Sequence, residues 1–211
     1  MNRRPIALAF AALLLLPLAG CGSLLGPKES PTIYAPVPAP TADPSWPTVT
    51  WRLATVRPEA PRILDSARMA VRPVPGELQV YKGAMWASPP PELLEASVLR
   101  LLEDSGKIPA AARQGSGMDA TYRLVLDIRH FEADYAGAAT PSAVVEVNAK
   151  LIHVEDHALA GNRTFRTAQP VGGTDVRLVA DAFSRALATV SRDIAGWTLV
   201  AGQAHEGQSH R

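Results

Sequence analysis

The feature that most constrains the fold is a long alternation of apolar and polar residues in the second half of the chain. From Tyr122 to Ile128 every second residue is apolar, and the same pattern returns from Ala143 to Leu151. A period of two is that of a β-strand with one buried face. Arg163–Thr167 gives a third strand, and turn-rich segments at 137–141 and 153–161 separate the three. The sequence therefore predicts an antiparallel meander, which must bury its apolar face against another layer.

Two segments have the apolar spacing of helices that can form this second layer. The first helix is predicted to begin at Ser88-Pro89-Pro90-Pro91, because proline fits the first helical turn, and to end near Gly106. The second begins at Thr174 and runs for about 20 residues. The polar residues 201–211 are expected to be a disordered tail. The stripe of the second helix is the most regular in the chain and comprises Val176, Val179, Ala180, Phe183, Leu187, Val190, Ile194 and Trp197.

Further strands are predicted before the first helix, at residues 48–56, near 67–72 and at 77–87. In the meander, the apolar phase switches at His130, which predicts a β-bulge before Phe131. Only two helices serve five or six strands, and most connections have hairpin length. We therefore expect an α+β fold, with a largely antiparallel sheet of five to six strands and two helices packed on one face. This domain is expected to span residues 48–200.

The N-terminus has the organisation of a secretory signal at residues 1–20. Arg3 and Arg4 precede an apolar run from Ile6 to Leu18, and small residues follow before Cys21. The run is about 13 residues long, which is shorter than the ~20 needed for a membrane helix. Leu18-Ala19-Gly20-Cys21 resembles the lipobox of bacterial lipoproteins, which implies cleavage before Cys21 and acylation of its thiol and amine. Several acyl chains give a stable membrane anchor.

The alternative is an ordinary secreted protein with a chance cysteine at its cleavage site. Cys21 is the only cysteine in the chain, so no intramolecular disulfide can form, and an unpaired thiol in an exported protein needs a reason. Lipidation supplies one. By resemblance to enterobacterial lipoproteins, the absence of Asp after Cys21 favours sorting to the outer membrane, facing the periplasm.

Residues 21–47 are expected to form the lipidated cysteine and a proline-rich tether, because prolines prevent helix formation and favour extended chain. Three interpretations of Ile33-Tyr34 stay open: plain linker, a short pairing segment, or part of a partner's docking site. Cleavage before Cys21 would leave 191 of the 211 residues, which suits one domain plus linkers. The net charge of +1 provides no field to attract nucleic acid.

Candidate sites for catalysis or metal binding are weak, so we predict no enzyme activity and no cofactor. His153 and His157 have the spacing of zinc ligands on a helix, but they lie where a strand enters a turn. Ser116 lacks the Gly-x-Ser-x-Gly context of a nucleophile elbow. The acidic residues Asp127, Glu132 and Asp134 and the pair Asp65-Ser66 are interpreted as a charged sheet face and a turn. Gly172-Gly173-Thr174 lacks the lysine of a phosphate-binding loop.

Several short segments, taken in order, resemble the ABC-type transport auxiliary lipoprotein family, which includes PqiC-like intermembrane transport lipoproteins. The resemblance spans roughly residues 50–199. The segments that carry it are Arg62-Ile63-Leu64-Asp65-Ser66-Ala67-Arg68-Met69-Ala70, Pro75-Gly76-Glu77-Leu78, Trp86-Ala87-Ser88-Pro89-Pro90, Tyr122-Arg123-Leu124, Phe131-Glu132-Ala133-Asp134-Tyr135, Pro141-Ser142 and Ala182-Phe183-Ser184-Arg185-Ala186 to Trp197.

This resemblance implies an accessory lipoprotein of a transport system that combines an MCE (mammalian cell entry) protein with ABC or other inner-membrane components. Such systems move lipids or other hydrophobic compounds between two membranes, and the lipoprotein would dock the periplasmic MCE assembly at the outer membrane. A homo-oligomer is a further hypothesis. Two alternatives stay open: a structural envelope lipoprotein, and a carrier that binds lipid in a pocket lined by Trp86, Phe183 and Trp197.

Overall fold

A computed structural model describes residues 30–209 of the chain. The predicted signal peptide and Cys21 therefore lie outside the described residues. One compact unit begins at Pro31. Its elements are β1 (Thr32–Tyr34), β2 (Leu53–Thr55), β3 (Arg68–Arg72), β4 (Gln79–Trp86), α2 (Pro90–Asp104), β5 (Ala111–Arg113), β6 (Tyr122–Asp134), β7 (Ser142–His153), β8 (Leu159–Pro170) and α3 (Val176–Ser209).

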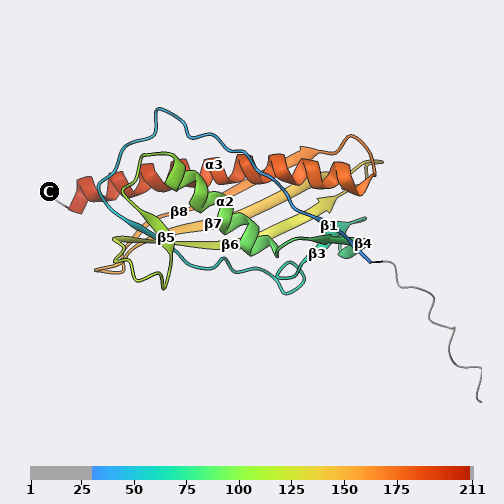
Figure 1. The fold of residues 1–211 in the computed structure, drawn as a ribbon, viewed down its shortest axis with the longest axis horizontal. Coiled ribbons are helices and arrows are strands. Elements are labelled where there is room, and N and C mark those ends of the chain that lie inside the picture. Colours follow the sequence, from blue (N-terminus) through green and yellow to red (C-terminus); the bar gives the residue numbers. More distant parts are fainter. Residues whose placement is uncertain (1–29, 210–211) are drawn as a thin grey trace, which may run out of the picture. The chain divides into compact units, whose positions relative to one another are not determined.

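The sheet is organised around β6, which has a different arrangement of partners on each edge (Figure 1). One edge pairs along its length with antiparallel β7, and β7 pairs in turn with antiparallel β8. The other edge is shared: β2 lies parallel to the start of β6, and β3 lies parallel to its end. Beyond these strands lie β5 on one branch and β4 with β1 on the other.

Within the described residues, the α+β class with two helices is confirmed, but the expectation of a largely antiparallel sheet is wrong, because the sheet is mixed. Four strand pairs are parallel: β1 with β4, β2 with β5, β2 with β6, and β3 with β6. Parallel neighbours need a long crossover connection. The segment between β2 and β6 supplies one, because it contains α2. Hairpin-length turns in the meander predicted its antiparallel pairs correctly, but turn length says nothing about pairing across such crossovers.

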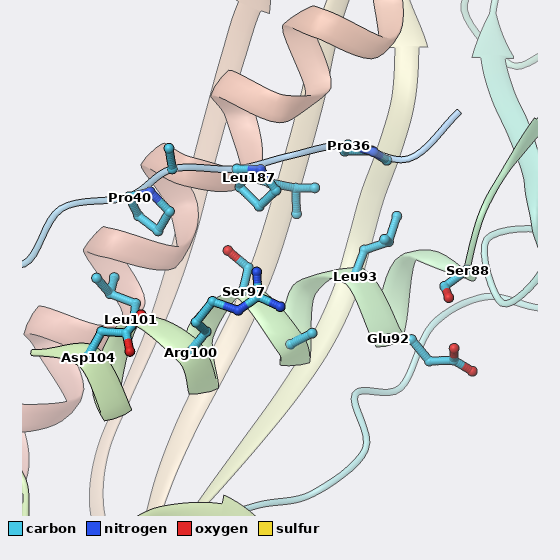
Figure 2. A pocket seen from close by; sticks show the side chains of 13 residues that line it. Pro36, Pro40, Ser88, Glu92, Leu93, Ser97, Arg100, Leu101, Asp104 and Leu187 are labelled. Carbon is cyan, nitrogen blue, oxygen red and sulfur yellow. The ribbon is translucent and has the colours of Figure 1, made fainter. Parts of the chain in front are cut away.

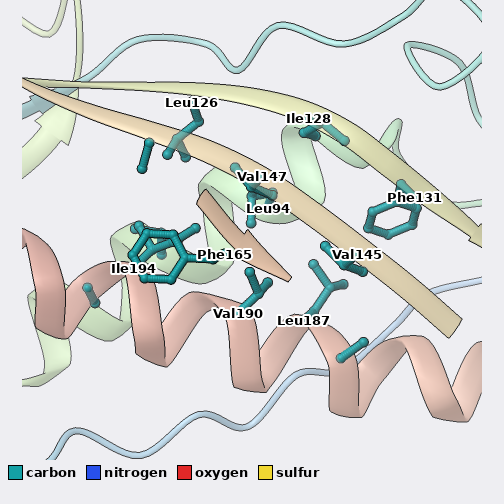
Figure 3. Packing of buried hydrophobic residues seen from close by; sticks show 14 of the residues in the cluster. Leu94, Leu126, Ile128, Phe131, Val145, Val147, Phe165, Leu187, Val190 and Ile194 are labelled. Atoms are coloured by element: carbon teal, nitrogen blue, oxygen red, sulfur yellow. The ribbon is translucent and has the colours of Figure 1, made fainter. Parts of the chain in front are cut away.

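The predicted bulge is confirmed, since the register of β6 against β7 shifts between Ile128 and His130. The shift returns Phe131 to the buried face, so the apolar side of β6 continues through the bend. Figure 3 shows this core: side chains of β6, β7 and β8 meet those of α2 and α3. Both helices lie over the same face of the sheet (Figure 1). The fully buried members include Leu94, Leu126, Ile128, Phe131, Val145, Val147, Leu187, Val190 and Ile194.

The C-terminal helix is longer than its apolar stripe indicates. α3 continues through residues 201–209, where the sequence predicted a disordered tail. The extension is held by tertiary contacts: Gly202 lies against the ring of Trp51, and the Tyr122 hydroxyl donates to Glu206 Oε1 at 2.7 Å. A polar composition cannot reveal such contacts. Among the described residues, no helix has the length and apolar character needed to cross a membrane.

Candidate docking site

Residues 35–47, which we call the strap, cross α2 and α3 (Figure 2) and include a turn at residues 44–46. Pro36, Pro38 and Pro40 are half-buried, whereas the residues between them are exposed. This period of two is that of an extended chain with one face against a surface. Proline suits it, because an extended chain outside a sheet needs no ladder N–H. The strap starts directly after β1, whose Ile33 pairs with Met85 of β4. The structure therefore confirms the interpretation of Ile33-Tyr34 as a short pairing segment.

Polar contacts fix the strap at its centre and end. Arg192 of α3 donates through Nε to the Thr41 carbonyl at 3.1 Å and through Nη2 to Asp43 Oδ2 at 2.8 Å. The Ser45 hydroxyl and N–H also donate to Asp43, and these bonds, with the nearby Arg192, hold the pKa of that carboxyl below its ordinary value. Lys107 Nζ donates to the Pro44 carbonyl at 3.0 Å. The strap therefore belongs to the compact unit, whereas the sequence predicted a tether as far as residue 47.

Glycines in α3 let aromatic rings approach the helix closely. A Cβ on Gly196 would lie 2.5 Å from Trp46 Nε1 at the end of the strap. Farther along the helix, a Cβ on Gly202 would collide with the ring of Trp51. Both positions need glycine for space rather than for backbone freedom, so a tryptophan faces a glycine twice along this helix. Glycine is unfavourable inside a helix, so its presence at 196 and 202 was the available sequence signal that other groups approach the helix closely there.

A groove of about 300 Å³ lies between the strap and α2 (Figure 2). Its apolar walls come from Pro36, Pro38 and Pro40 on one side and from Leu93 and Leu101 on the other, with Leu187 of α3 beneath. Exposed charges of α2 lie along its rim: Glu92, Arg100 and Asp104. Such a groove suits an apolar side chain or short extended segment. Neither histidine nor cysteine lines it, and the nearby Ser97 hydroxyl accepts from Ser191 at 2.8 Å.

A second hollow, of about 400 Å³, lies between α3, β8 and the end of the strap. We call it the α3–β8 hollow. Its aromatic lining is Trp46, Phe165 and Trp197, with the Phe165 and Trp197 rings 5.7 Å apart in an edge contact. The guanidinium of Arg163 stands 5.1 Å from the centre of the Phe165 ring. An aromatic lining beside charged groups is typical of protein recognition surfaces.

The candidate catalytic and metal residues have separate structural roles. His153 Nδ1 lies 2.7 Å from Asp156, and His157 lies in the turn with φ +59°. Within the described residues, no group of three or more His, Cys, Asp or Glu side chains is placed to hold a metal ion. Ser116 lies in the turn between β5 and β6, and the Ser66 hydroxyl donates to the Ile63 carbonyl.

The three carboxylates proposed as a charged sheet face do not converge. Asp127 lies 3.9 Å from Arg129, and Asp134 accepts from the Ala136 N–H in the turn after β6. Glu132 is buried, only 1% exposed. Its Oε1 accepts from Arg72 Nη2 at 2.9 Å and lies 2.7 Å from His130 Nδ1; its Oε2 accepts from the Phe131 N–H. A carboxylate so fully bonded stabilises the end of β6 rather than acting as a free base.

Two of the three residues proposed to line a lipid pocket pack as core. Trp86 and Phe183 are buried in direct edge contact, with ring centres 5.1 Å apart, and Phe131 packs against both, 5.9 Å from Trp86 and 4.7 Å from Phe183. Trp197 lies elsewhere, in the α3–β8 hollow.

A cluster that sequence reasoning missed surrounds Tyr122, whose hydroxyl lies 2.8 Å from His205 Nδ1 and donates to Glu206. Burial, with Glu206 beside it, raises the pKa of Tyr122. It was missed because residues 201–211 were expected to be disordered.

The model of the ABC-type transport auxiliary lipoprotein component family matches residues 32–195. The chain belongs to this family. The match begins at Thr32, the first residue of β1, so the strap lies within the family's domain. The family is an auxiliary component of ABC-type transport and not a known enzyme family, and its lipoprotein nature implies a membrane-associated location in the envelope.

Solved structures agree with this assignment. Protein XCC0632 from Xanthomonas campestris is 49% identical, with a TM-score of 0.81, over 83% of this chain and 99% of that one. A second crystal structure, of an uncharacterised protein, is 16% identical with a TM-score of 0.61, over 79% of this chain and 97% of that one, and shows the shared fold alone.

Among curated proteins, the uncharacterised protein bll6063 of Bradyrhizobium diazoefficiens is 25% identical over 154 residues, or 73% of this chain. The match covers 41% of that protein, so the chain spans about two fifths of the length of this relative.

Proposed function

We propose that this protein is a non-enzymatic docking lipoprotein of an intermembrane transport system. In this proposal Cys21 is acylated, holds the protein at the outer membrane, and presents the domain to the periplasm. There the domain binds an MCE-domain protein whose system transports lipids or other hydrophobic compounds. ATP hydrolysis belongs to an inner-membrane partner. The family supports the transport role and the lipoprotein class, and the finer assignments are our own.

The observation that carries the proposal is the attachment of the strap to α3 and to Lys107, which follows α2. Because the compact unit begins at Pro31, few residues separate it from the proposed anchor. From Cys21 to Thr32 there are 11 Cα steps (32 − 21), which span at most about 40 Å when fully extended. A tether reaching residue 47 would allow more than twice that distance. The domain is therefore held near the membrane that contains the anchor, as a docking component requires.

The sheet supplies surface for a partner on the side that the helices leave open. Its polar face carries a charge network, in which the half-buried Glu146 lies 3.3 Å from the exposed Arg166 and 3.8 Å from Arg129. Such pairs contribute little to stability in water. They keep the face soluble while leaving donors and acceptors available to a partner.

The proposal is tested by purifying the tagged full chain from envelope membranes in a mild nonionic detergent. We expect an MCE-domain protein and an ABC permease to be recovered in constant ratio to this chain. A Cys21→Ser variant, which should leave the membrane, is the matched control and should recover less of both. Recovery of only wall or unrelated porin proteins would instead favour the structural envelope lipoprotein and would contradict the proposal.

A further inference from the structure

Strand β8 forms an open edge of the sheet. Within residues 30–209, β8 pairs with β7 alone, so its second side is unpaired over a strand of 12 residues. Long open edges are hazardous, because their free N–H and C=O groups attract other strands, and proteins usually shorten or cover them. We therefore expect another strand to pair with an open edge of this length.

The pairing with β7 determines which backbone groups of β8 face outward. The Val171 N–H donates to the Pro141 carbonyl at 3.0 Å, and the next pair in register is Ser142 with Pro170. Because bonded and non-bonded pairs alternate in an antiparallel ladder, the odd-numbered residues of β8 from 161 onward bond to β7. The even-numbered residues direct N–H and C=O to the open side. Pro170, which has no N–H, falls in this outward set, where proline is tolerated.

The α3–β8 hollow lies beside this edge. A strand added along β8 would alternate its side chains between the two faces of the sheet. Those on the helix side would meet Phe165, Trp197 and Trp46. Val200 of α3 borders the same hollow and is 54% exposed, although it is a large apolar residue. Backbone pairing and a side-chain pocket are thus adjacent, as strand-addition sites require.

The charges around the β8 edge indicate which charge a partner strand should carry. Residues 159–170 contain two arginines and no acidic residue. Arg166 faces Glu146 of β7, whereas Arg163 contacts the Phe165 ring and has no ion-pair partner among the described residues. On the rim of the hollow, Asp43 and Arg192 bind each other, and the exposed Asp193 of α3 adds a negative charge. A carboxylate from the partner would therefore bind at Arg163, on the β8 side of the hollow, and not on the α3 side.

We propose that the open edge of β8 docks an extended strand of a partner protein. The strand adds to the sheet, places a bulky apolar side chain in the α3–β8 hollow, and sets a carboxylate beside Arg163. A second copy of β8 is the poorer occupant, because self-pairing would bring four arginines together along one seam with no acid among the paired strands. The inference needs neither acylation of Cys21 nor an MCE partner, so it can fail independently of the proposed function.

The experiment pans a phage-displayed library of short random peptides against the full chain in nonionic detergent. We expect selected peptides to alternate apolar residues with Asp or Glu. Ala168→Pro removes one outward N–H without touching the β7 ladder and should abolish selection. Arg163→Glu should shift the selected charge from acidic to basic, whereas Arg185→Glu, an exposed change on α3, should leave the selection unchanged.

Val200→Glu is a second variant that should impair binding, in case Ala168→Pro fails to fold. It places a charge at the α3–β8 hollow and leaves β8 unaltered. It should weaken a selected peptide by about tenfold. No enrichment, or peptides that bind Ala168→Pro and Val200→Glu as well as the unaltered chain, would overturn the proposal. Sedimentation showing a dimer that Ala168→Pro dissociates would also overturn it, because a second copy would then occupy the edge.

Discussion

Gly196 of α3 lies directly against the indole of Trp46, with room for no side chain between them: an added Cβ would be 2.5 Å from Nε1. This contact joins the last helix to the strap, although the two residues are far apart in sequence. The strap follows the segment that bears the proposed anchor, so this contact attaches that part of the chain to the domain core. The strap is therefore part of the fold, and substitutions in this contact should change the free energy of unfolding.

Gly196→Ala should displace Trp46 and destabilise the protein by about 1–3 kcal/mol, because overpacking outweighs the helix propensity gained from alanine. Urea unfolding followed by tryptophan fluorescence measures the change. Gly207→Ala in the same helix is the matched control, since nothing lies within 4 Å of its added Cβ. It should be neutral or stabilising by at most about 1 kcal/mol. Equal effects of the two substitutions would contradict the Trp46 contact.

The strap should loosen in acid. Bonds from Ser45 and the charge of Arg192 keep the pKa of Asp43 below its ordinary value of 3.8. A carboxyl with a lowered folded-state pKa stabilises fully above its unfolded pKa, and this contribution is lost as pH falls through the folded value. Tryptophan fluorescence, to which Trp46 contributes, should therefore change below about pH 4. Ser45→Ala should move this change to higher pH, and an unmoved profile would speak against the role of Asp43.

Glu132 should be the costliest carboxylate to replace. Glu132→Gln removes the charge of a buried acceptor that pairs with the partly exposed Arg72, and loss of such charged hydrogen bonds costs about 1–3 kcal/mol. Glu146→Gln is the control: its pairs with Arg129 and Arg166 lie on the exposed face, and the loss should stay below about 1 kcal/mol. Urea denaturation compares the two. The double variant Arg72→Leu, Glu132→Leu should be more stable than Glu132→Gln, since it leaves no unpaired charge.

Phe183→Ala distinguishes a packed core from a lipid pocket. If Phe183 is core, as its stacking on Phe131 at 4.7 Å indicates, the substitution should cost about 3–5 kcal/mol. Mass spectrometry of organic extracts should then find the same lipids, or none, with both purified proteins. A lipid bound by the unaltered protein and absent from Phe183→Ala, at equal stability, would restore the carrier hypothesis.

Local patterns predicted the elements whose burial has a simple period. The alternation at 122–128 and 143–151, the phase change at His130 and the stripe of α3 all correspond to observed structure. These features depend on neighbouring residues within one element, so the chain itself displays them.

The features that were missed depend on pairs distant in sequence. Parallel pairing of β2 with β6 needs a crossover through α2, which no local pattern registers. The strap and the end of α3 are polar or proline-rich, and distant contacts hold them: Trp46 and Arg192 for the strap, and Trp51 and Tyr122 for the end of α3. The alternate prolines at 36, 38 and 40 were the available signal, because alternate burial is how an extended chain lies on a surface.

The central claim is that acylated Cys21 holds this domain at the outer membrane. The direct measurement separates inner from outer membranes on a sucrose gradient and quantifies the protein in each fraction, for the natural chain and for Cys21→Ser. We predict that the natural chain sediments with the outer membrane and that Cys21→Ser is released to the soluble periplasmic fraction. Identical distributions of the two, or sedimentation of the natural chain with the inner membrane, would contradict the account.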